Sequence, residues 1–405
     1  MDIINDNYPF CPTFTNNLLG CTPSLMRHSS DFISIVKPNP IPSSIMRIYR
    51  NIYSVHKWFG LVSGIFLLLL GVSGSILVFK DELEHLLDHE STKVIPTGKP
   101  LSLDTLYQVI VKEYPRLDGA SWINPVASPD ESYKFRLYLN DAKLMTYDLG
   151  GLNINQYTGK IIRTGRSDTF VTGLMDWLFQ FHFSFHLGMP GAALTAIMGI
   201  CMLISIITGL IVYRKFIWKV LTFKVQIKTK NWRTISSDLH RIVGVWALLF
   251  NIIVFFTGFW MNLFAFETEK WKVEKELAPE NTLVKVSIDK MYHEARLKMP
   301  DLVPNYVYFP TQPEKKFNVR GNIAGQNALF AGGNFIKLDA QTGKFSSMGR
   351  FEEMEFWDKV EALFYPLHVG NYGGILLKIL YVILGLSPAL LSITGFLLWW
   401  RKVKM

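Results

Sequence analysis

Residues 238–264 read DLHRIVGVWALLFNIIVFFTGFWMNLF, and no side chain between Ile242 and Phe264 carries a charge. An α-helix rises about 1.5 Å per residue and the hydrocarbon core of a bilayer is about 30 Å thick, so this run is long enough to cross a membrane. Three more apolar runs have a similar length, with Lys378 as their only charged residue: Trp58–Phe79, Gly191–Tyr213 and Ile375–Trp400. The sequence therefore predicts a four-helix transmembrane bundle.

The basic residues gather at one end of the predicted helices. The 405 residues carry a formal charge of +9, and lysines and arginines concentrate before the first run, between the second and third, and after the fourth. Short loops rich in these residues stay in the cytoplasm, so both termini and the link are expected there, and the two long loops outside. The basic link is also able to contact anionic lipid of the bilayer. Because this topology accounts for the charge, we expect no nucleic acid partner.

The first 45 residues are polar and rich in Asn, Ser and Pro, which favours disorder. They lack the apolar core and cleavage site of a signal peptide, and Met46 is a candidate start of the protein. Of the three cysteines, Cys11 and Cys21 lie in this segment and Cys201 in the second apolar run. The long loops therefore have no disulfide framework.

Comparison of the chain with itself indicates an internal duplication. A shift of 184 residues aligns HKWFG (56–60) with HRIVG (240–244), and TGK (158–160) with TGK (342–344). After a two-residue slip, HLGMPG (186–191) matches HVGNYG (368–373). Both halves start in the cytoplasm, so the repeats are parallel and a pseudo-twofold axis along the membrane normal is expected.

Each long loop reads as a small α+β domain, with a short helix followed by alternating strands. The expected division of the chain is a disordered extension at 1–45, helix 1 at 46–80, an external domain at 81–170, an interfacial segment and helix 2 at 171–215, a basic cytoplasmic link at 216–237, helix 3 at 238–265, a second external domain at 266–360, and an interfacial segment, helix 4 and a basic tail at 361–405.

Five of the nine histidines lie at the ends of the predicted spans. The duplication makes His56 equivalent to His240, and His186 equivalent to His368. A twofold axis places equivalent groups at one depth on opposite sides of the axis, so each pair is expected to face across the bundle. Two opposed imidazoles suit the two axial positions of a haem iron, and small residues nearby leave room for a flat ring. We therefore expect one haem at each membrane face.

Alternatives remain for each histidine. A single interfacial histidine is more often a hydrogen-bonded anchor than a ligand, and glycines on a span also serve close helix packing. Zinc would need further ligands that no cysteine or carboxylate cluster supplies. His182 lies four residues before His186 on the same helix face, so it is able to replace His186 as the ligand, bind a second group, or form a hydrogen bond.

These features together resemble the PepSY-associated transmembrane family. The resemblance covers about residues 47–404 and rests on HKWFGLVSG, FHFSFHLGMPG, SDLHRIVG and LHVGNYGG, the helix endings TGLIVYRK and TGFLLWWRK, and the TGK turns of the two external domains. It implies a multi-pass protein of the bacterial inner (cytoplasmic) membrane with two periplasmic PepSY-like domains. Members similar to siderophore reductases hold two b-type haems. The resemblance would place the inner haem on His56 and His240, and the outer haem on His368 with His186 or His182.

The first hypothesis is therefore a di-haem membrane oxidoreductase that accepts electrons from quinol or a cytoplasmic reductase and reduces a ferric siderophore or another ferric chelate outside. No nucleotide-binding motif indicates a built-in NAD(P)H or flavin site. The alternative is a non-enzymatic, membrane-anchored PepSY module that binds a peptide or regulates a protease. A transporter is disfavoured, because the sequence shows no broken helix and no polar site midway along a span.

Overall fold

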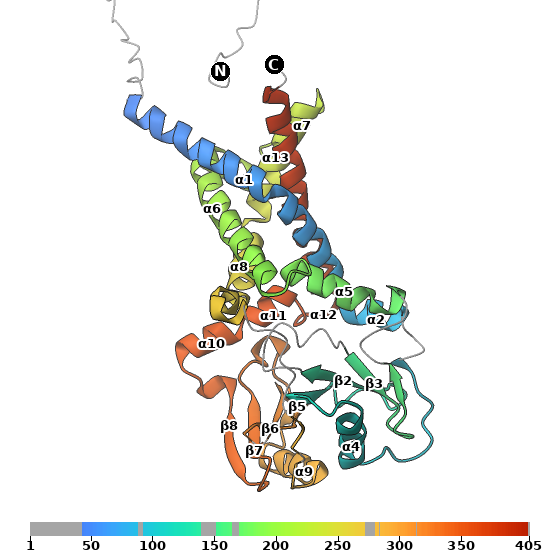
Figure 1. Cartoon of the computed structure of the whole chain (residues 1–405). Helices are drawn as coiled ribbons and strands as arrows, with labels where there is room; N and C mark the ends of the chain where they lie inside the picture. The colour runs from blue at the N-terminus through green and yellow to red at the C-terminus, as the bar shows by residue number, and fades with distance from the viewer. Residues whose placement is uncertain are drawn as a thin grey trace, which may run out of the picture. The chain divides into compact units, whose positions relative to one another are not determined.

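The computed structural model describes residues 43–87, 92–138, 151–163, 170–271, 280–282, 284–312 and 314–403. Within these residues three helical stretches are long and apolar enough to cross a membrane: α1 (Ser43–Leu77), α6 (Gly188–Leu221), and Gly374–Trp400, which comprises α12 (Gly374–Gly385) and most of α13 (Ser387–Val403). The chain is therefore a membrane-type protein (Figure 1). The expected disorder of residues 1–45 falls almost wholly outside the described residues.

A fourth span exists only if two helices are counted together. Helices α7 (Trp232–Trp246) and α8 (Leu248–Met261) meet at Ala247 with a bend of 68°. The ψ of Ala247 is 3°, far from the helical value, and the two halves follow different partners: α7 packs along α13, whereas α8 packs along α6 and α11 (Phe364–Val369). The expectation of unbroken spans was wrong at this point.

A polar contact lies beside the bend. Asn251, in the second turn of α8, donates to the Ser387 hydroxyl at the start of α13 over 3.1 Å, and both side chains are buried. The expectation that no span carries a polar site midway along its length was therefore also wrong. Since a buried amide needs a partner, this pair fixes the start of α8 against the start of α13.

Eight antiparallel strands form one sheet. Their order is β4 (Ile161–Arg163), β3 (Gly151–Ile154), β2 (Tyr133–Tyr138), β1 (Gly119–Ile123), β5 (Leu302–Pro310), β6 (Lys316–Ile323), β7 (Phe335–Asp339) and β8 (Phe345–Gly349). The first four strands come from one long loop and the last four from the other. They join through β1 and β5, where Ser121 pairs with Tyr308. The two loops therefore share a sheet, where the sequence predicts two separate domains.

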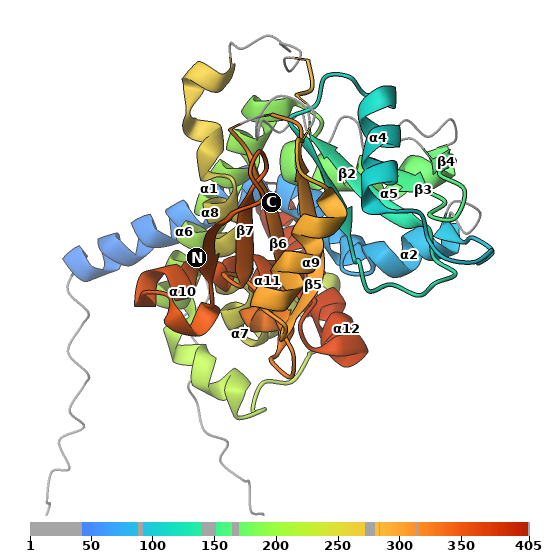
Figure 2. The same ribbon diagram turned by 90° about the horizontal axis from the view of Figure 1, so that it is seen from below.

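Two helices cover one face of this sheet. Helices α4 (Leu103–Glu113) and α9 (Ile288–Lys298) pack on alternate strand residues, which are fully buried, as the period of two along a strand requires. Figure 2, seen from below, shows α4 and α9 in front of the strands, and Figure 1 shows the apolar helices beyond the sheet. The other face of the sheet is therefore turned toward the apolar helices.

The two covering helices cap one another. Ser102 and Ser287 are the N-cap residues, and each accepts from a backbone N–H of its own first turn. In addition, the Asp289 carboxylate accepts from Leu103 N–H over 3.0 Å, and the Asp104 carboxylate accepts from Ile288 N–H over 2.7 Å. Carboxylates stabilise the N-terminal end of a helix, so this exchange joins the two halves of the sheet region at a second place.

Several short helices connect the sheet region to the apolar helices. They are α2 (Lys80–Leu87), α5 (Phe170–Ser184), α10 (Phe356–Ala362) and α11, with single 3₁₀ turns at Leu263–Phe266 and Thr268–Trp271. Helix α5 contacts α2 and α6, and α11 contacts α8. These helices carry the second pair of histidines.

We expect Phe309→Ala to destabilise the sheet region by about 3–5 kcal/mol, because the phenyl ring is fully buried under α4 and α9 and its loss leaves a cavity. Val303→Ala on the same strand is the matched control, since Val303 is 38% exposed. Urea-dependent pulse proteolysis of the detergent-solubilised protein measures both. Equal effects of the two substitutions would contradict this assignment of the core.

Candidate functional site

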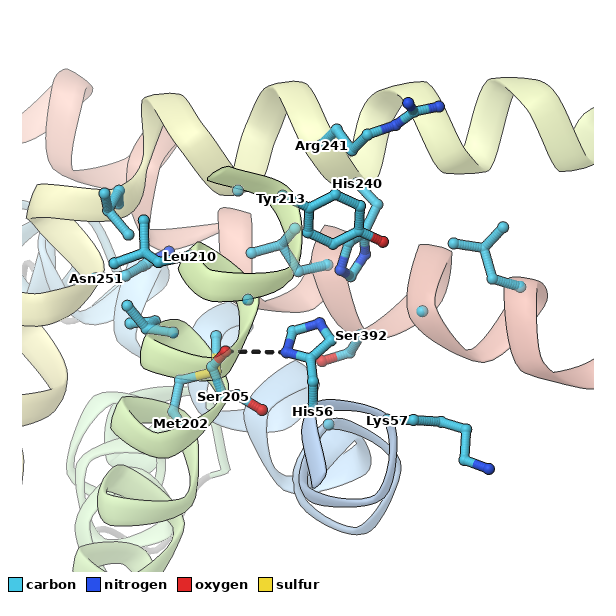
Figure 3. Close-up of a pocket in the computed structure, with 18 of the residues that line it drawn as sticks. His56, Lys57, Met202, Ser205, Leu210, Tyr213, His240, Arg241, Asn251 and Ser392 are labelled. Carbon is cyan, nitrogen blue, oxygen red and sulfur yellow. Dashed lines mark hydrogen bonds between the residues drawn. The ribbon is translucent and has the colours of Figure 1, made fainter. Parts of the chain in front are cut away.

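The structure brings His56 of α1 and His240 of α7 together. Their ring centroids are 6.2 Å apart and the ring planes differ by 81°. Figure 3 shows the two imidazoles pointing toward one another across a cavity that Gly60, Gly209, Gly244 and Gly395 help to line. Helices α1, α6, α7, α8 and α13 all contribute residues to this cavity. The facing pair that the duplication predicts for these two residues is present in the structure.

A second pair consists of His182 near the end of α5 and His368 near the end of α11. Their ring centroids are 6.3 Å apart, with planes 52° apart. His182 lies beside Ser73 of α1, which is 17 residues beyond His56. At 1.5 Å per residue this separation is about 26 Å along the helix, so the two pairs lie near opposite ends of the bundle.

His186 does not take part in the second pair. Helix α5 ends at Ser184, and both Phe185 and His186 have positive φ, 49° and 59°. This turn carries His186 to the surface, where its ring lies 4.7 Å from that of Trp177. His186 therefore does not face His368 in the structure, and His182, the alternative that the sequence left open, occupies the facing position.

One hydroxyl and one glycine hold each imidazole. The Nδ1 atom of His182 lies 2.9 Å from Ser73 Oγ, that of His368 3.0 Å from Thr257 Oγ1, and that of His240 2.9 Å from Thr394 Oγ1. The Nδ1 of His56 lies 2.9 Å from the Ser205 carbonyl and 3.4 Å from Thr208 Oγ1. Every one of these hydroxyl residues is followed directly by glycine: Gly74, Gly258, Gly395 and Gly209.

These contacts fix the protonation of the rings. A hydroxyl has one proton, and Ser73, Thr257 and Thr394 each donate theirs to the carbonyl four residues back, over 2.7–2.8 Å. The hydroxyl oxygen therefore accepts from the imidazole Nδ1–H. The Ser205 carbonyl facing His56 has only lone pairs and also requires Nδ1–H. All four Nε2 atoms thus keep a free lone pair, as a metal-ligating histidine needs.

The glycines provide the space for the rings. A Cβ placed on Gly74 would lie 2.8 Å from His182 Cε1, and one on Gly258 would lie 2.9 Å from His368 Cε1. For Gly209 and Gly395 the distances to His56 and His240 are 3.1 Å and 3.5 Å. A larger residue at the first two positions would displace the imidazole.

The spacing of the rings suits one metal between each pair. Metal–imidazole bonds are about 2.0–2.1 Å, and the ring centroid lies about 1.1 Å behind the nitrogen, so imidazoles on opposite sides of one metal have centroids roughly 6.3 Å apart. Across the described residues no three or more His, Cys, Asp or Glu side chains gather into a metal site. Each pair thus offers two ligands, which suits a metal whose other ligands come from a macrocycle rather than tetrahedral zinc.

A buried ion cluster links α5 to the sheet. Glu84 of α2 contacts Lys134 of β2 at 2.6 Å and Arg163 of β4 at 3.0 Å, and Arg163 reaches Asp176 of α5 at 3.4 Å. Burial alone would raise the pKa of Glu84, but Lys134, Lys80 and Arg163 outweigh burial and lower that pKa to about 2. Sequence reasoning missed this cluster, because its members are isolated charges far apart in the chain.

The chain belongs to the PepSY-associated transmembrane family, whose model, described as the PepSY-associated TM region, matches residues 53–402. The chain is also similar to an uncharacterized protein of Pseudomonas aeruginosa, with 23% identity over 255 residues. That match covers 56% of this chain and 64% of the Pseudomonas protein, so it spans less than two thirds of the relative's length. The family that the sequence resembles is thereby confirmed.

We expect Glu84→Gln to destabilise the contact between α2, α5 and the sheet by about 3 kcal/mol at pH 7, because it leaves three cations around a neutral amide. The pKa of Glu84 is lowered on folding, so its stabilising effect is full above about pH 4.5 and is lost as the pH falls toward about 2. The difference in melting temperature between wild type and variant should therefore shrink at pH 3. A difference that stays constant between pH 7 and pH 3 would refute the assignment.

Proposed function

We propose that this protein is a di-haem, b-type transmembrane electron carrier that reduces a ferric chelate, most simply a ferric siderophore, on the side of the membrane where the sheet lies. The observation that supports it best is the presence of two facing histidine pairs near opposite ends of the bundle. The ring centroids are 6.2 Å apart within one pair and 6.3 Å apart within the other. We also propose that the protein lies in the bacterial inner membrane, with both termini in the cytoplasm and the sheet region in the periplasm. Its two halves would have arisen by internal duplication.

The residues present fit a haem at each pair. Four Nε2 lone pairs are directed by Nδ1 hydrogen bonds, and glycines leave space beside each ring. His56 and His240 would hold the inner haem, and His182 and His368 the outer one. Bound haem supplies one-electron chemistry at iron. The chain supplies neutral ligands, fixes their orientation, and surrounds them with apolar side chains that exclude water.

The direction of electron flow follows from the positions of the two pairs. Electrons from quinol or a cytoplasmic reductase would enter near His56 and His240 and leave near His182 and His368.

Two other functions are alternatives to electron transfer. The edge strands β4 and β8 would suit a PepSY module that binds a peptide, and the bend at Ala247 with the Asn251–Ser387 pair would suit a transporter. Neither alternative uses four neutral imidazoles with free Nε2 atoms.

We expect the purified protein to show a reduced-minus-oxidised b-type spectrum with two haems per chain. Replacing His56 or His240 with Ala should remove one haem, and replacing His182 or His368 should remove the other, because each pair would lose one of the two imidazoles that would hold the haem. His186→Ala is the matched control and should keep both haems. Haem content is measured by the pyridine haemochrome assay. Colourless wild-type protein from haem-replete cells would refute the proposed function.

Gly74→Ala tests the fit at the outer pair. The added methyl group would lie 2.8 Å from His182 Cε1 and push the ring off its position, so we expect the affinity for the outer haem to fall about tenfold or more. Gly64→Ala on the same helix is the control, because its nearest neighbour, Ser392, is 3.8 Å away. Haem titration of the apo-protein compares the two variants. Equal affinities would show that Gly74 does not provide the space for a ligand.

A further inference from the structure

The sheet face opposite α4 and α9 carries a cluster of phenols and cations. Strand register places Arg136, Ser121, Tyr308, Asn318 and Lys337 side by side in one row across five strands. A second row two residues along contains Tyr306 and Arg320. Strands lie about 4.8 Å apart, so the row is roughly 19 Å wide. We call Arg136, Tyr138, Tyr306, Tyr308, Asn318 and Arg320 the phenol face.

Tyr138 lies against both of the other phenols of this face. The hydroxyl groups of Tyr138 and Tyr306 are 2.5 Å apart, and the rings of Tyr138 and Tyr308 are 6.0 Å apart. Tyr308 donates to the Asp118 carbonyl. Burial, followed by the nearby Tyr138, raises the pKa of Tyr306, so this phenol stays protonated. The cluster offers aromatic surface and neutral hydroxyl groups on a rigid sheet.

Positive charge surrounds the phenols. Arg136 and Arg320 flank them, and Lys337 continues the row. Among the described residues, neither Arg320 nor Lys337 forms an ion pair with a carboxylate. Two acidic residues lie on this side of the sheet: Asp339 holds its own turn by accepting from the backbone N–H groups of Gln341 and Thr342, and Glu84 is paired with Lys134 and Arg163. The phenol face is therefore suited to an anion.

The phenol face also contains a buried hydrogen-bond acceptor, the amide oxygen of Asn318, that no group of the described residues satisfies. A buried amide oxygen without a partner is unfavourable unless water or a ligand supplies a donor. The outer face of a sheet is usually solvated and satisfied by water. Here half-buried phenols beside that oxygen indicate a surface that receives a molecule.

The phenol face is turned toward the second histidine pair. Lys134, on the same side of β2 as Arg136, contacts Glu84 of α2, and Glu84 connects through Arg163 to Asp176 of α5. Helix α5 also carries His182. Figures 1 and 2 agree that the sheet lies between α4 and α9 on one side and the apolar helices on the other. A molecule on this face would therefore lie on the His182 side of the bundle.

We infer that the phenol face binds an anionic, oxygen-rich iron(III) chelate with aromatic donor groups, and so selects the substrate class. This inference rests on the proposed function. Arginine donates in parallel to paired anionic oxygens, and tyrosine rings stack on aromatic chelate arms. A neutral trihydroxamate chelate would gain neither the charge contacts nor the stacking, so the face prefers tris-catecholate chemistry.

Binding is tested without electron transfer by using Ga³⁺, which is not reduced at biological potentials. We expect Ga³⁺–tris(catecholate) to bind the oxidised, full-length protein in neutral detergent, and uncharged Ga³⁺–tris(acetohydroxamate) to bind at least tenfold more weakly, as equilibrium dialysis measures. Arg320→Gln should weaken catecholate binding about tenfold, since one charge-assisted contact is lost. Tyr306→Phe, which preserves the ring, should weaken it less. Lys290→Gln on the exposed side of α9 is the charge-matched control and should bind as wild type.

Equal binding of the two chelates, or an unchanged dissociation constant in Arg320→Gln, would overturn the inference. Competition by anionic lipid with no chelate binding would also overturn it and would assign the face to the membrane. Haem content is measured on the same samples. Protein with two haems that fails to bind the catecholate refutes the phenol face alone, whereas haem-free protein that still binds it refutes the proposed function and leaves the face as an anion site.

Discussion

The hydrogen bond at Nδ1 of each paired histidine is the constraint on which the candidate site depends. An imidazole near a membrane has two tautomers and a freely rotating ring, and neither property suits a ligand. In this protein a hydroxyl that has already donated its proton, or a carbonyl, faces each Nδ1. The proton is thereby held on Nδ1, and the lone pair of Nε2 is left free. Because glycine follows each hydroxyl residue, the ring lies against the neighbouring backbone, where side-chain atoms would otherwise be.

The packing of the helices follows from this arrangement. His56 is held by α6 and His240 by α13, while His182 is held by α1 and His368 by α8. Each histidine is thus fixed by a helix other than its own, so the four contacts also hold the bundle together. The bend at Ala247 is consistent with this demand, because α7 must reach α13 with His240 while α8 must reach α11 with Thr257. A single straight helix could not place His240 against α13 and Thr257 against α11 at the same time.

Much of this arrangement could be predicted from the sequence. The apolar runs and the pairing of His56 with His240 follow from helix length and from the repeat of 184 residues. Which histidine faces His368 could not be decided in this way. The unslipped repeat places Ser184 opposite His368, and His182 and His186 lie two residues to either side. The choice depends on where α5 ends, and the positive φ of Phe185 and His186 is not readable from their residue types.

The joining of the two loops into one sheet was equally beyond the sequence, since strand pairing between β1 and β5 involves residues almost 190 positions apart. It matters for the proposed binding face because a sheet of four strands would have β1 or β5 as an exposed edge. Pairing them removes both edges and brings Tyr138 from one half into contact with Tyr306 and Tyr308 from the other. The cluster of phenols exists only in the joined sheet. The exchange of Asp104 and Asp289 between α4 and α9 joins the two halves from the opposite face, so the pairing of β1 with β5 is supported by contacts on both sides of the sheet.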